Sequence, residues 1–377
     1  MNKNEIIEKL LASIDISPTM EKNAHDRYES ISKYLEEQGL NCNFYPQGSF
    51  LLGTVVRPYK DGKDKIYDLD VISMIDKEKF DTNPNQTKND VGKLLKESGL
   101  YSEKLKEEDT HCWTLEYANV GDVGFTLDIV PSVVNDYSVY DNYNEATIDQ
   151  KSISITERIS DGRYEWKQSN PIGFGDWFSQ ISNRHMSESQ IIQQRNRLLY
   201  ELRGLYASAE EIPTYLYRSS LQRSVQLLKR IRDVYYERKT NQLYKPSTFL
   251  LTSLVASAVE HEDNLSVDEI INNFINRYKK GTIPIMHGIN IINPIDSSEV
   301  INYDWTRKHH ESIADWLNHI EKYLLNIETR KFEQEIRNEL HVPVSSDINT
   351  NENDVSEIKP WREEYISLQI YINKLMN

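Results

Sequence analysis

Two aspartates stand two residues apart in the stretch 66–75 (IYDLDVISMI), which alternates and is rich in β-branched residues. This pattern predicts a strand. Side chains at i and i+2 of a strand point to one face, so the carboxylates of Asp68 and Asp70 would lie side by side while Leu69 and Val71 point into the core. Neighbouring carboxylates repel each other unless a cation lies between them, and Mg²⁺ prefers oxygen ligands. The pair therefore fits a magnesium site, although a solvated strand face would produce the same residues.

A third aspartate, Asp128, favours the metal hypothesis. It lies between the apolar residues Leu127 and Ile129 in 123–130 (VGFTLDIV), a second predicted strand. An acid from an adjacent strand would complete a two-metal site, in which one ion holds a triphosphate and the other lowers the pKa of an attacking hydroxyl. Asp122 is the rival ligand, but a turn explains it better. The predicted catalytic residues and metal ligands are Asp68, Asp70 and Asp128, with Mg²⁺ as the metal and Mn²⁺ as its alternative.

A glycine–serine turn could bind phosphate. Gly48 and Ser49 follow Gln47 and precede a short predicted helix over 50–52. Backbone N–H groups at such a turn face an anion, and glycine allows close approach. An isolated Gly-Ser pair is usually an ordinary strand-to-helix turn, but this one precedes the acidic strand by about twenty residues. We therefore predict that Gln47, Gly48 and Ser49 bind a nucleotide.

The elements that must position these residues mix helix and strand up to about residue 135. Apolar residues recur at helical spacing over 3–38, with a break at Pro18. The remaining predictions are an extended segment over 43–47, a polar loop over 58–65 with a turn at Asp61-Gly62, a helix over 87–97, and a hairpin of 111–118 with 123–130 around Gly121-Asp122. The polar stretch 136–170 reads as irregular or short-stranded.

From about residue 185 onward, helices dominate. They are predicted over 217–238, 249–260, 266–278, 304–340 and 361–375, and Ser266 with Glu269 forms a capping box. The fold class is therefore α+β. We expect a catalytic lobe over 1–200, whose N-terminal helix bridges to a helical lobe over 201–377, with the active site in the cleft.

Composition excludes several classes of protein. Lys and Arg total 44 against 59 Asp and Glu, a net charge of −15, which argues against stable binding of duplex DNA. The two cysteines, Cys42 and Cys112, lack the spacing of a zinc site and suit a reducing cytoplasm. No signal peptide is visible, and the longest apolar stretch, 249–259, is too short to span a bilayer. We expect a cytoplasmic protein that does not bind membranes.

Together, these motifs resemble a known superfamily. Gly48-Ser49, Asp68-Leu69-Asp70 and an aspartate on a later strand form the pattern of the polymerase-β-like nucleotidyltransferases. QGSFLLGTVVRP followed by YDLDVI is similar to the CD-NTases, the bacterial enzymes related to cGAS and the oligoadenylate synthases. The helical lobe also resembles that family, at 221–233, at 245–248, and at Asn293-Pro294 upstream of Trp305. The resemblance covers roughly 25–320, and the stretch 57–67 is longer than in minimal nucleotidyltransferases.

The resemblance implies a polymerase-β-like lobe with a small mixed sheet, in which Lys229 and Ser247 contact the phosphates of the donor nucleotide. From the residues alone, Lys229 is equally well a solvated charge on an amphipathic helix, and Ser247 a helix N-cap. Arg57 could face phosphate or cap its loop, and stays outside the predicted site.

The activity implied by the resemblance is that of CD-NTases in CBASS anti-phage defence. A ribose hydroxyl of one nucleotide would attack the α-phosphate of another, releasing pyrophosphate and finally giving a cyclic di- or trinucleotide. The substrates are nucleoside triphosphates, with ATP expected among them, and the product would activate a separate effector.

Two alternatives stay open. One is a nucleotidyltransferase that modifies RNA ends or protein hydroxyls, against which stands the lack of a basic extension. The other is a nucleotide-binding regulator without turnover, which would have no need for three converging acids. We expect either basal activity or control by a regulatory protein partner or small metabolite, and not by duplex DNA.

Overall fold

The computed structural model describes residues 3–16, 18–57, 59–60, 63–64, 67–120, 123–135, 147–160, 162–186, 218–239, 242–281, 289–325 and 329–342. Contacts group residues 1–340 into one compact unit and 341–377 into another. The expected lobe boundary at residue 200, the helix over 361–375 and the turns at 61–62 and 121–122 lie outside the described residues. The two-lobe division therefore stays a prediction.

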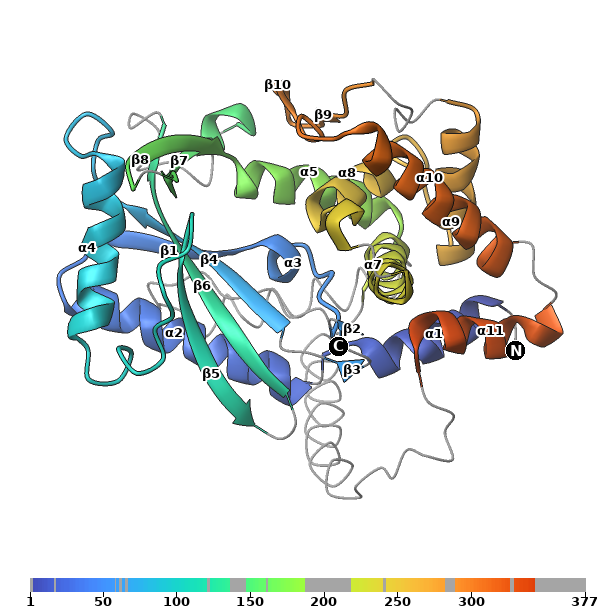
Figure 1. The fold of residues 1–377 in the computed structure, drawn as a ribbon, viewed down its shortest axis with the longest axis horizontal. Coiled ribbons are helices and arrows are strands. Elements are labelled where there is room, and N and C mark those ends of the chain that lie inside the picture. Colours follow the sequence, from blue (N-terminus) through green and yellow to red (C-terminus); the bar gives the residue numbers. More distant parts are fainter. Residues whose placement is uncertain are drawn as a thin grey trace, which may run out of the picture. The chain divides into compact units, whose positions relative to one another are not determined.

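A six-stranded mixed sheet carries the residues of interest (Figure 1). Its order is β1 (Cys42–Gln47), β4 (Tyr67–Ile75), β6 (Val123–Val134), β7 (Ile153–Arg158) and β8 (Tyr164–Ser169), while β5 (Trp113–Val120) also pairs with β6. The strands β4 and β6 are parallel, and the other pairs are antiparallel. The strands predicted over 43–47 and 66–75 and the predicted hairpin are confirmed. The stretch 136–170, which sequence placed poorly, supplies β7 and β8.

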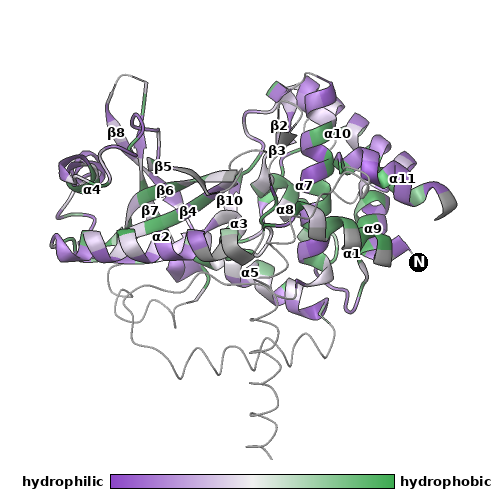
Figure 2. Ribbon diagram, turned by 90° about the horizontal axis from the view of Figure 1, so that it is seen from below, coloured by the Kyte–Doolittle hydropathy of each residue, from purple (hydrophilic) through white to green (hydrophobic). Residues whose placement is uncertain are grey.

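One face of the sheet forms the main core. Odd-numbered residues of the central strands, such as Leu69 and Leu127, are fully buried there with Tyr28 and Ile31 of α2 (Pro18–Glu37) and Val91 of α4 (Pro84–Glu97). Figure 2 shows apolar central strands lying along α2, which carries many hydrophilic residues. The alternation in the first half of β4, where Tyr67, Leu69 and Val71 are buried between Asp68 and Asp70, favours this register, because a slip of one residue would bring the aspartates into the core.

The opposite face is divided along the strands. Tyr45, Ile72, Met74 and Val130 form a second apolar cluster on it. Asp70 lies two residues before Ile72 on the same face of β4. The aspartates therefore lie at the border between this apolar cluster and the polar side chains of the same face. Asp70 and Asp128 are therefore partly shielded from water, whereas Asp68 is exposed.

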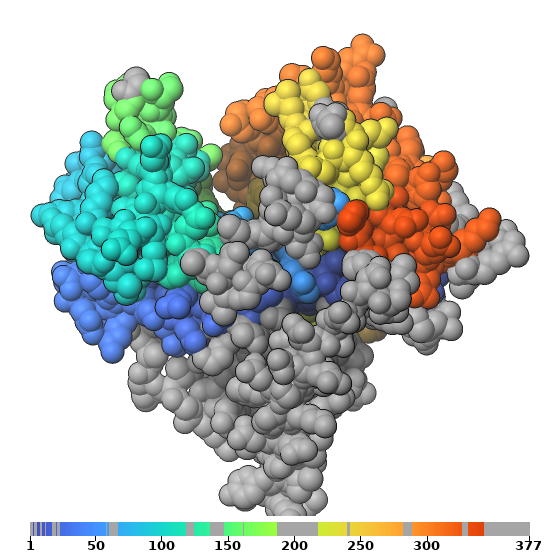
Figure 3. Space-filling view, turned by 60° about the horizontal axis from the view of Figure 1, so that its bottom comes forward, coloured from blue at the N-terminus to red at the C-terminus, as the bar shows by residue number. Residues whose placement is uncertain are grey.

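The helices after residue 218 agree with the sequence analysis. They are α7 (Ser220–Arg238), α8 (Thr248–Ser257), α9 (Val267–Lys279), α10 (Arg307–Ile320) and α11 (Thr329–Leu340), after α5 (Pro171–Arg184) of the preceding part. Figure 3 shows the helical part in yellow to red. The expected Ser266–Glu269 capping box is present. At the N-terminus, α1 (Lys3–Ile14) packs against α7, α9 and α11.

Short strands occur where none was predicted. The loop 58–65 contains the pair β2 (Tyr59–Lys60) and β3 (Lys63–Asp64), and β9 (Ile292–Asn293) pairs with β10 (Asp296–Val300) among the helices. Strands of this length carry too little periodicity to be read from sequence. Among the described residues, no helix combines the length and the apolar character needed to cross a membrane.

Candidate active site

The register of three strands brings the predicted aspartates together. Asp70 of β4 lies directly beside Asp128 of β6, and Asp68 lies beside Thr126 one step along the same face. Paired positions on neighbouring strands are separated by about 4.8 Å. On the other side of β4, Gln47 of β1 is the register partner of Asp70. The parallel pairing of β4 with β6 therefore supplies the proximity that the sequence could not.

The electrostatics of the site reflect this crowding. Burial, reinforced by the charges of Asp128 and Asp68, raises the pKa of Asp70 from 3.8 to about 7, while the charge of Lys229 opposes the shift. Burial also raises the pKa of Asp128, and the charge of Asp68 adds to this effect. A cation among these groups would relieve the repulsion.

Threonine hydroxyls bond to two of the carboxylates. Thr114 Oγ1 on β5 donates to Asp128 Oδ1 at 2.5 Å, and Thr126 Oγ1 donates to Asp68 Oδ1. Our sequence analysis missed both threonines. The available signal was a repeated tetrapeptide of aromatic residue, threonine, leucine and acid, which occurs as Trp113–Glu116 and as Phe125–Asp128 on the two arms of the hairpin.

The three aspartates suit a hard divalent cation by donor chemistry and by placement on one face. Carboxylate oxygens are the ligands that Mg²⁺ prefers. As they stand, no group of three or more His, Cys, Asp or Glu side chains in the described part of the chain is arranged tightly enough to hold a metal ion. Two of the carboxylates instead accept hydrogen bonds from threonines. Burial raises the pKa of both free cysteines, Cys42 and Cys112, to about 12, so neither is a ready thiolate ligand for zinc.

Gly48 lies against Asp70. Its φ is +61°, in the left-handed region that favours glycine, and a Cβ at this position would lie 2.8 Å from Asp70 Oδ2. Glycine is thus required both by the backbone and by the carboxylate. The turn begins α3 (Gly48–Leu51), a single helical turn, close to the predicted 50–52. Ser49 accepts a hydrogen bond at its carbonyl from Thr54 N at 2.9 Å, which closes the turn.

Lys229 lies at the site but is not a solvated charge. It is 8% exposed, and its Nζ donates to the carbonyl oxygen of Thr54 at 2.8 Å. Burial, with the nearby charge of Arg232, lowers the pKa of Lys229 to about 7, and Asp70 is among the acids that oppose this shift. The amphipathic-helix reading of α7 is therefore wrong, because nearly every side chain of this helix is buried.

One cause of this burial, beside the helices α8, α9 and α11 that pack against α7, is a short segment that we call the strap, residues 52–57, which follows the Gly48 turn. Side chains from the start and one face of α7 donate to its carbonyl oxygens. The donors and acceptors are Gln222 to Leu52, Arg218 to Gly53, Lys229 to Thr54, Gln226 to Val55 and Arg230 to Arg57, over 2.6–3.0 Å. Three of these donors, Arg218, Lys229 and Arg230, are basic, and the five hydrogen bonds connect the segment after the Gly48 turn to α7.

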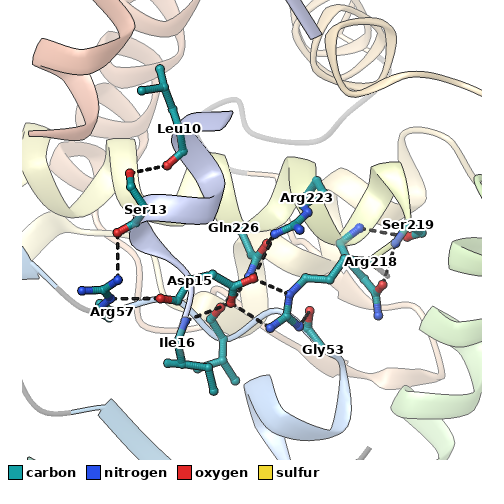
Figure 4. Close-up of polar contacts among 12 residues, drawn as sticks. Leu10, Ser13, Asp15, Ile16, Gly53, Arg57, Arg218, Ser219, Arg223 and Gln226 are labelled. Carbon is teal, nitrogen blue, oxygen red and sulfur yellow. Dashed lines mark hydrogen bonds and ion pairs between the residues drawn. The ribbon is translucent and has the colours of Figure 1, made fainter. Parts of the chain in front are cut away.

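Asp15 at the end of α1 completes this junction (Figure 4). Its carboxylate accepts from Arg218 Nε and Nη2 at 2.9 and 2.8 Å, from Arg223 Nη1 at 2.9 Å and from Gln226 Nε2 at 3.2 Å. Arg57, which we had left open as a phosphate ligand, instead donates to the carbonyl oxygens of Ser13 and Asp15. The first helix is thus tied to the strap and to α7.

Ser247 occupies the N-cap position of α8. Its hydroxyl accepts from Leu250 N at 3.2 Å, and the residue itself is exposed. The capping role predicted from the residues alone is therefore confirmed. Its contact with phosphate stays a prediction, as does that of Gln47 and Ser49, which are both partly exposed.

Comparison with known proteins shows which proteins this chain is similar to. Residues 1–182 match the profile of the Second Messenger Oligonucleotide or Dinucleotide Synthetase (SMODS) domain. The chain carries a SMODS domain. A c-di-GMP synthase of Roseivirga ehrenbergii is 29% identical over 312 residues, which cover 81% of this chain and 73% of that protein. The cyclic dinucleotide synthase CdnG of Bradyrhizobium diazoefficiens is 29% identical over 257 residues, which cover 65% of this chain and 56% of that protein.

A solved structure agrees with the fold. The structure of the B. diazoefficiens CD-NTase CdnG in complex with GTP matches with a TM-score of 0.62 at 21% identity, over 89% of this chain and 94% of that one. The predicted α+β, polymerase-β-like nucleotidyltransferase fold is thereby confirmed. The SMODS chain is a nucleotidyltransferase that makes a second messenger from nucleoside triphosphates, as the resemblance implied.

Proposed function

We propose that this SMODS chain joins nucleoside triphosphates into a cyclic dinucleotide, with GTP as a principal substrate and Mg²⁺ held by Asp68, Asp70 and Asp128. The sequence-based expectation favoured ATP. The names of the relatives favour GTP instead, because one is a c-di-GMP synthase and CdnG was solved with GTP. The observation that carries the active-site assignment is the register that sets Asp70 beside Asp128, next to the Gly48 turn.

In this proposal the three aspartates would hold the metal, which when bound would supply positive charge for the triphosphate and a lowered pKa for the attacking ribose hydroxyl. Gly48 leaves room for a phosphate group to approach the backbone beside Asp70. Lys229 is a buried side chain whose charge acts on Asp70, and it would counter negative charge there. Positioning and electrostatic stabilisation are the main sources of rate enhancement in such transfers.

The strap also has a role in this proposal, which is to keep the Gly48 turn close to Lys229. Because Lys229 donates to Thr54 O, the backbone between the Gly48 turn and β4 is held against α7. A donor triphosphate at the turn would lie close to the lysine without a long movement of either element. This arrangement supports the role of Lys229 that the family resemblance implied.

The test is to incubate the protein with all four triphosphates and Mg²⁺ and to identify the products by mass spectrometry. We expect a cyclic dinucleotide containing guanine, and no product from Asp68→Ala/Asp70→Ala, whose fold should be checked by circular dichroism. Labelled nucleotide appearing on added RNA or on the protein, instead of in a small molecule, would favour the alternative transferases. Near-normal synthesis by the double variant would overturn the site.

The resemblance further implies that the product activates a separate effector in anti-phage defence. This stays a prediction. Co-expression of the chain with genes that neighbour it, followed by phage challenge with wild type and the Asp68→Ala/Asp70→Ala variant, tests it. Protection that persists with the inactive variant would contradict a role for the product.

A further inference from the structure

We propose that Thr114 and Thr126 are positioning residues that orient the carboxylates of Asp128 and Asp68 for a divalent cation. This inference rests on the metal site of the proposed function. It adds two residues, neither of which would touch the metal, to the machinery that determines how tightly the metal binds.

The first support is the pairing pattern. Thr114 is the register partner of Asp128 across the antiparallel β5–β6 pair, and Thr126 is the register partner of Asp68 across the parallel β4–β6 pair. Register partners point to the same face of a sheet. Across the hairpin, the repeated tetrapeptide sets each threonine opposite an acid. Thr114 faces Asp128, and Thr126 faces Glu116 of β5, which is its second register partner beside Asp68.

The second support is the geometry of the bonds. Each hydroxyl donates to Oδ1 of its aspartate. A carboxylate has about four lone-pair sites, so Oδ2 and part of Oδ1 stay available to a cation. Threonine is branched at Cβ and stiff at χ1, and a hydrogen bond to a charged acceptor is stronger than a neutral one. Both properties restrict rotation of the aspartate side chain.

The same sheet supplies a comparison. Thr156 on β7 is fully buried, and within the described part its hydroxyl has no hydrogen-bond partner. A buried threonine in this sheet therefore does not by itself require a polar partner. Thr114 and Thr126 differ from Thr156 in that each bonds to an aspartate of the neighbouring strand.

Groups that hydrogen-bond to metal ligands typically change metal affinity by about 10–100-fold when removed. We therefore expect Thr114→Val and Thr126→Val each to raise the dissociation constant for Mn²⁺ by about tenfold or more. Thr114→Ser and Thr126→Ser keep the hydroxyl and should restore the wild-type value. Thr156→Val, the matched control, should leave it unchanged.

The experiment titrates Mn²⁺ into the full chain without nucleotide and follows free Mn²⁺ by electron paramagnetic resonance, so it does not depend on turnover. In parallel, the Mg²⁺ dependence of synthesis should show a raised apparent KM for Mg²⁺ and a kcat near wild type at saturating metal. A uniform loss of kcat with unchanged Mn²⁺ affinity, or serine variants that behave like the valine variants, would overturn the inference.

Asp68→Ala/Asp70→Ala separates this inference from the proposed function. If the double variant loses Mn²⁺ and the valine variants bind it like wild type, the metal site stands and the positioning role fails. If the double variant binds Mn²⁺ like wild type, the metal site itself is wrong and the inference fails with it.

Discussion

The raised pKa of Asp70 makes a quantitative prediction about stability in the absence of metal. Burial and two neighbouring acids hold this carboxyl at a pKa of about 7 in the folded protein, against 3.8 when it is free. The folded state therefore binds more protons than the unfolded state between these two values, and stability must fall as pH rises through this window. Asparagine has the shape of the protonated acid and does not ionise, so Asp70→Asn should escape this loss.

The magnitude follows from the shift. One pKa unit corresponds to about 1.4 kcal/mol, so the variant should exceed wild type in the free energy of unfolding by about 2 kcal/mol at pH 5 and about 4 kcal/mol at pH 8. Little attraction to Lys229 is lost at pH 8, because burial lowers the pKa of that lysine to about 7 and leaves it largely neutral there.

The assay is urea unfolding of wild type and Asp70→Asn in EDTA at pH 5 and pH 8, with Asp81→Asn as a control at an exposed aspartate. Adding Mg²⁺ should stabilise wild type and reduce the difference, because a cation bound only by the folded state adds stability. A variant no more stable than wild type at pH 8, or a difference that shrinks from pH 5 to pH 8, would refute the electrostatic argument.

Four further expectations concern single features. Gly48→Ala should abolish most synthesis, because the added methyl group would displace the carboxylate of Asp70. Gly162→Ala is the control: Gly162 has a φ of +81° and open space around its Cβ position, so this variant should show backbone strain alone. Equal activity of the two variants would contradict this. Lys229→Ala should raise KM for the donor triphosphate in initial-rate measurements, and unchanged kinetics would leave the lysine a purely structural role. Asp15→Ala should cost about 3–5 kcal/mol in urea unfolding, because it removes the carboxylate that accepts two hydrogen bonds from the buried Arg218; a cost no larger than that of an exposed ion pair would argue against the network. Long duplex DNA at physiological salt should not change the rate of synthesis, given 44 basic against 59 acidic residues, and stimulation lost on nuclease treatment would disprove this.

Local patterns in the sequence predicted several of the elements and the residues proposed for the site. Alternation with β-branched residues predicted β4 and the β5–β6 hairpin, and the spacing of Asp68 and Asp70 predicted two carboxylates on one face. The Ser266–Glu269 box located the start of α9. Each of these signals arises within a few residues, where the period of the backbone decides which side chains share a face.

Only the tertiary structure decided which elements meet. The parallel pairing of β4 with β6 sets Asp70 beside Asp128. It also allows the hydrogen bond between Thr126 and Asp68, two residues that are 58 positions apart in the sequence. The bond from Lys229 to Thr54 spans 175 residues. From the residues alone, Lys229 could equally well be a solvated charge, since periodicity does not reveal what covers a helix. Burial and long-range pairing are properties of the packed chain. Because of them, Arg218, Lys229 and Arg230 donate hydrogen bonds to the strap instead of facing water, and these bonds hold the strap beside the Gly48 turn.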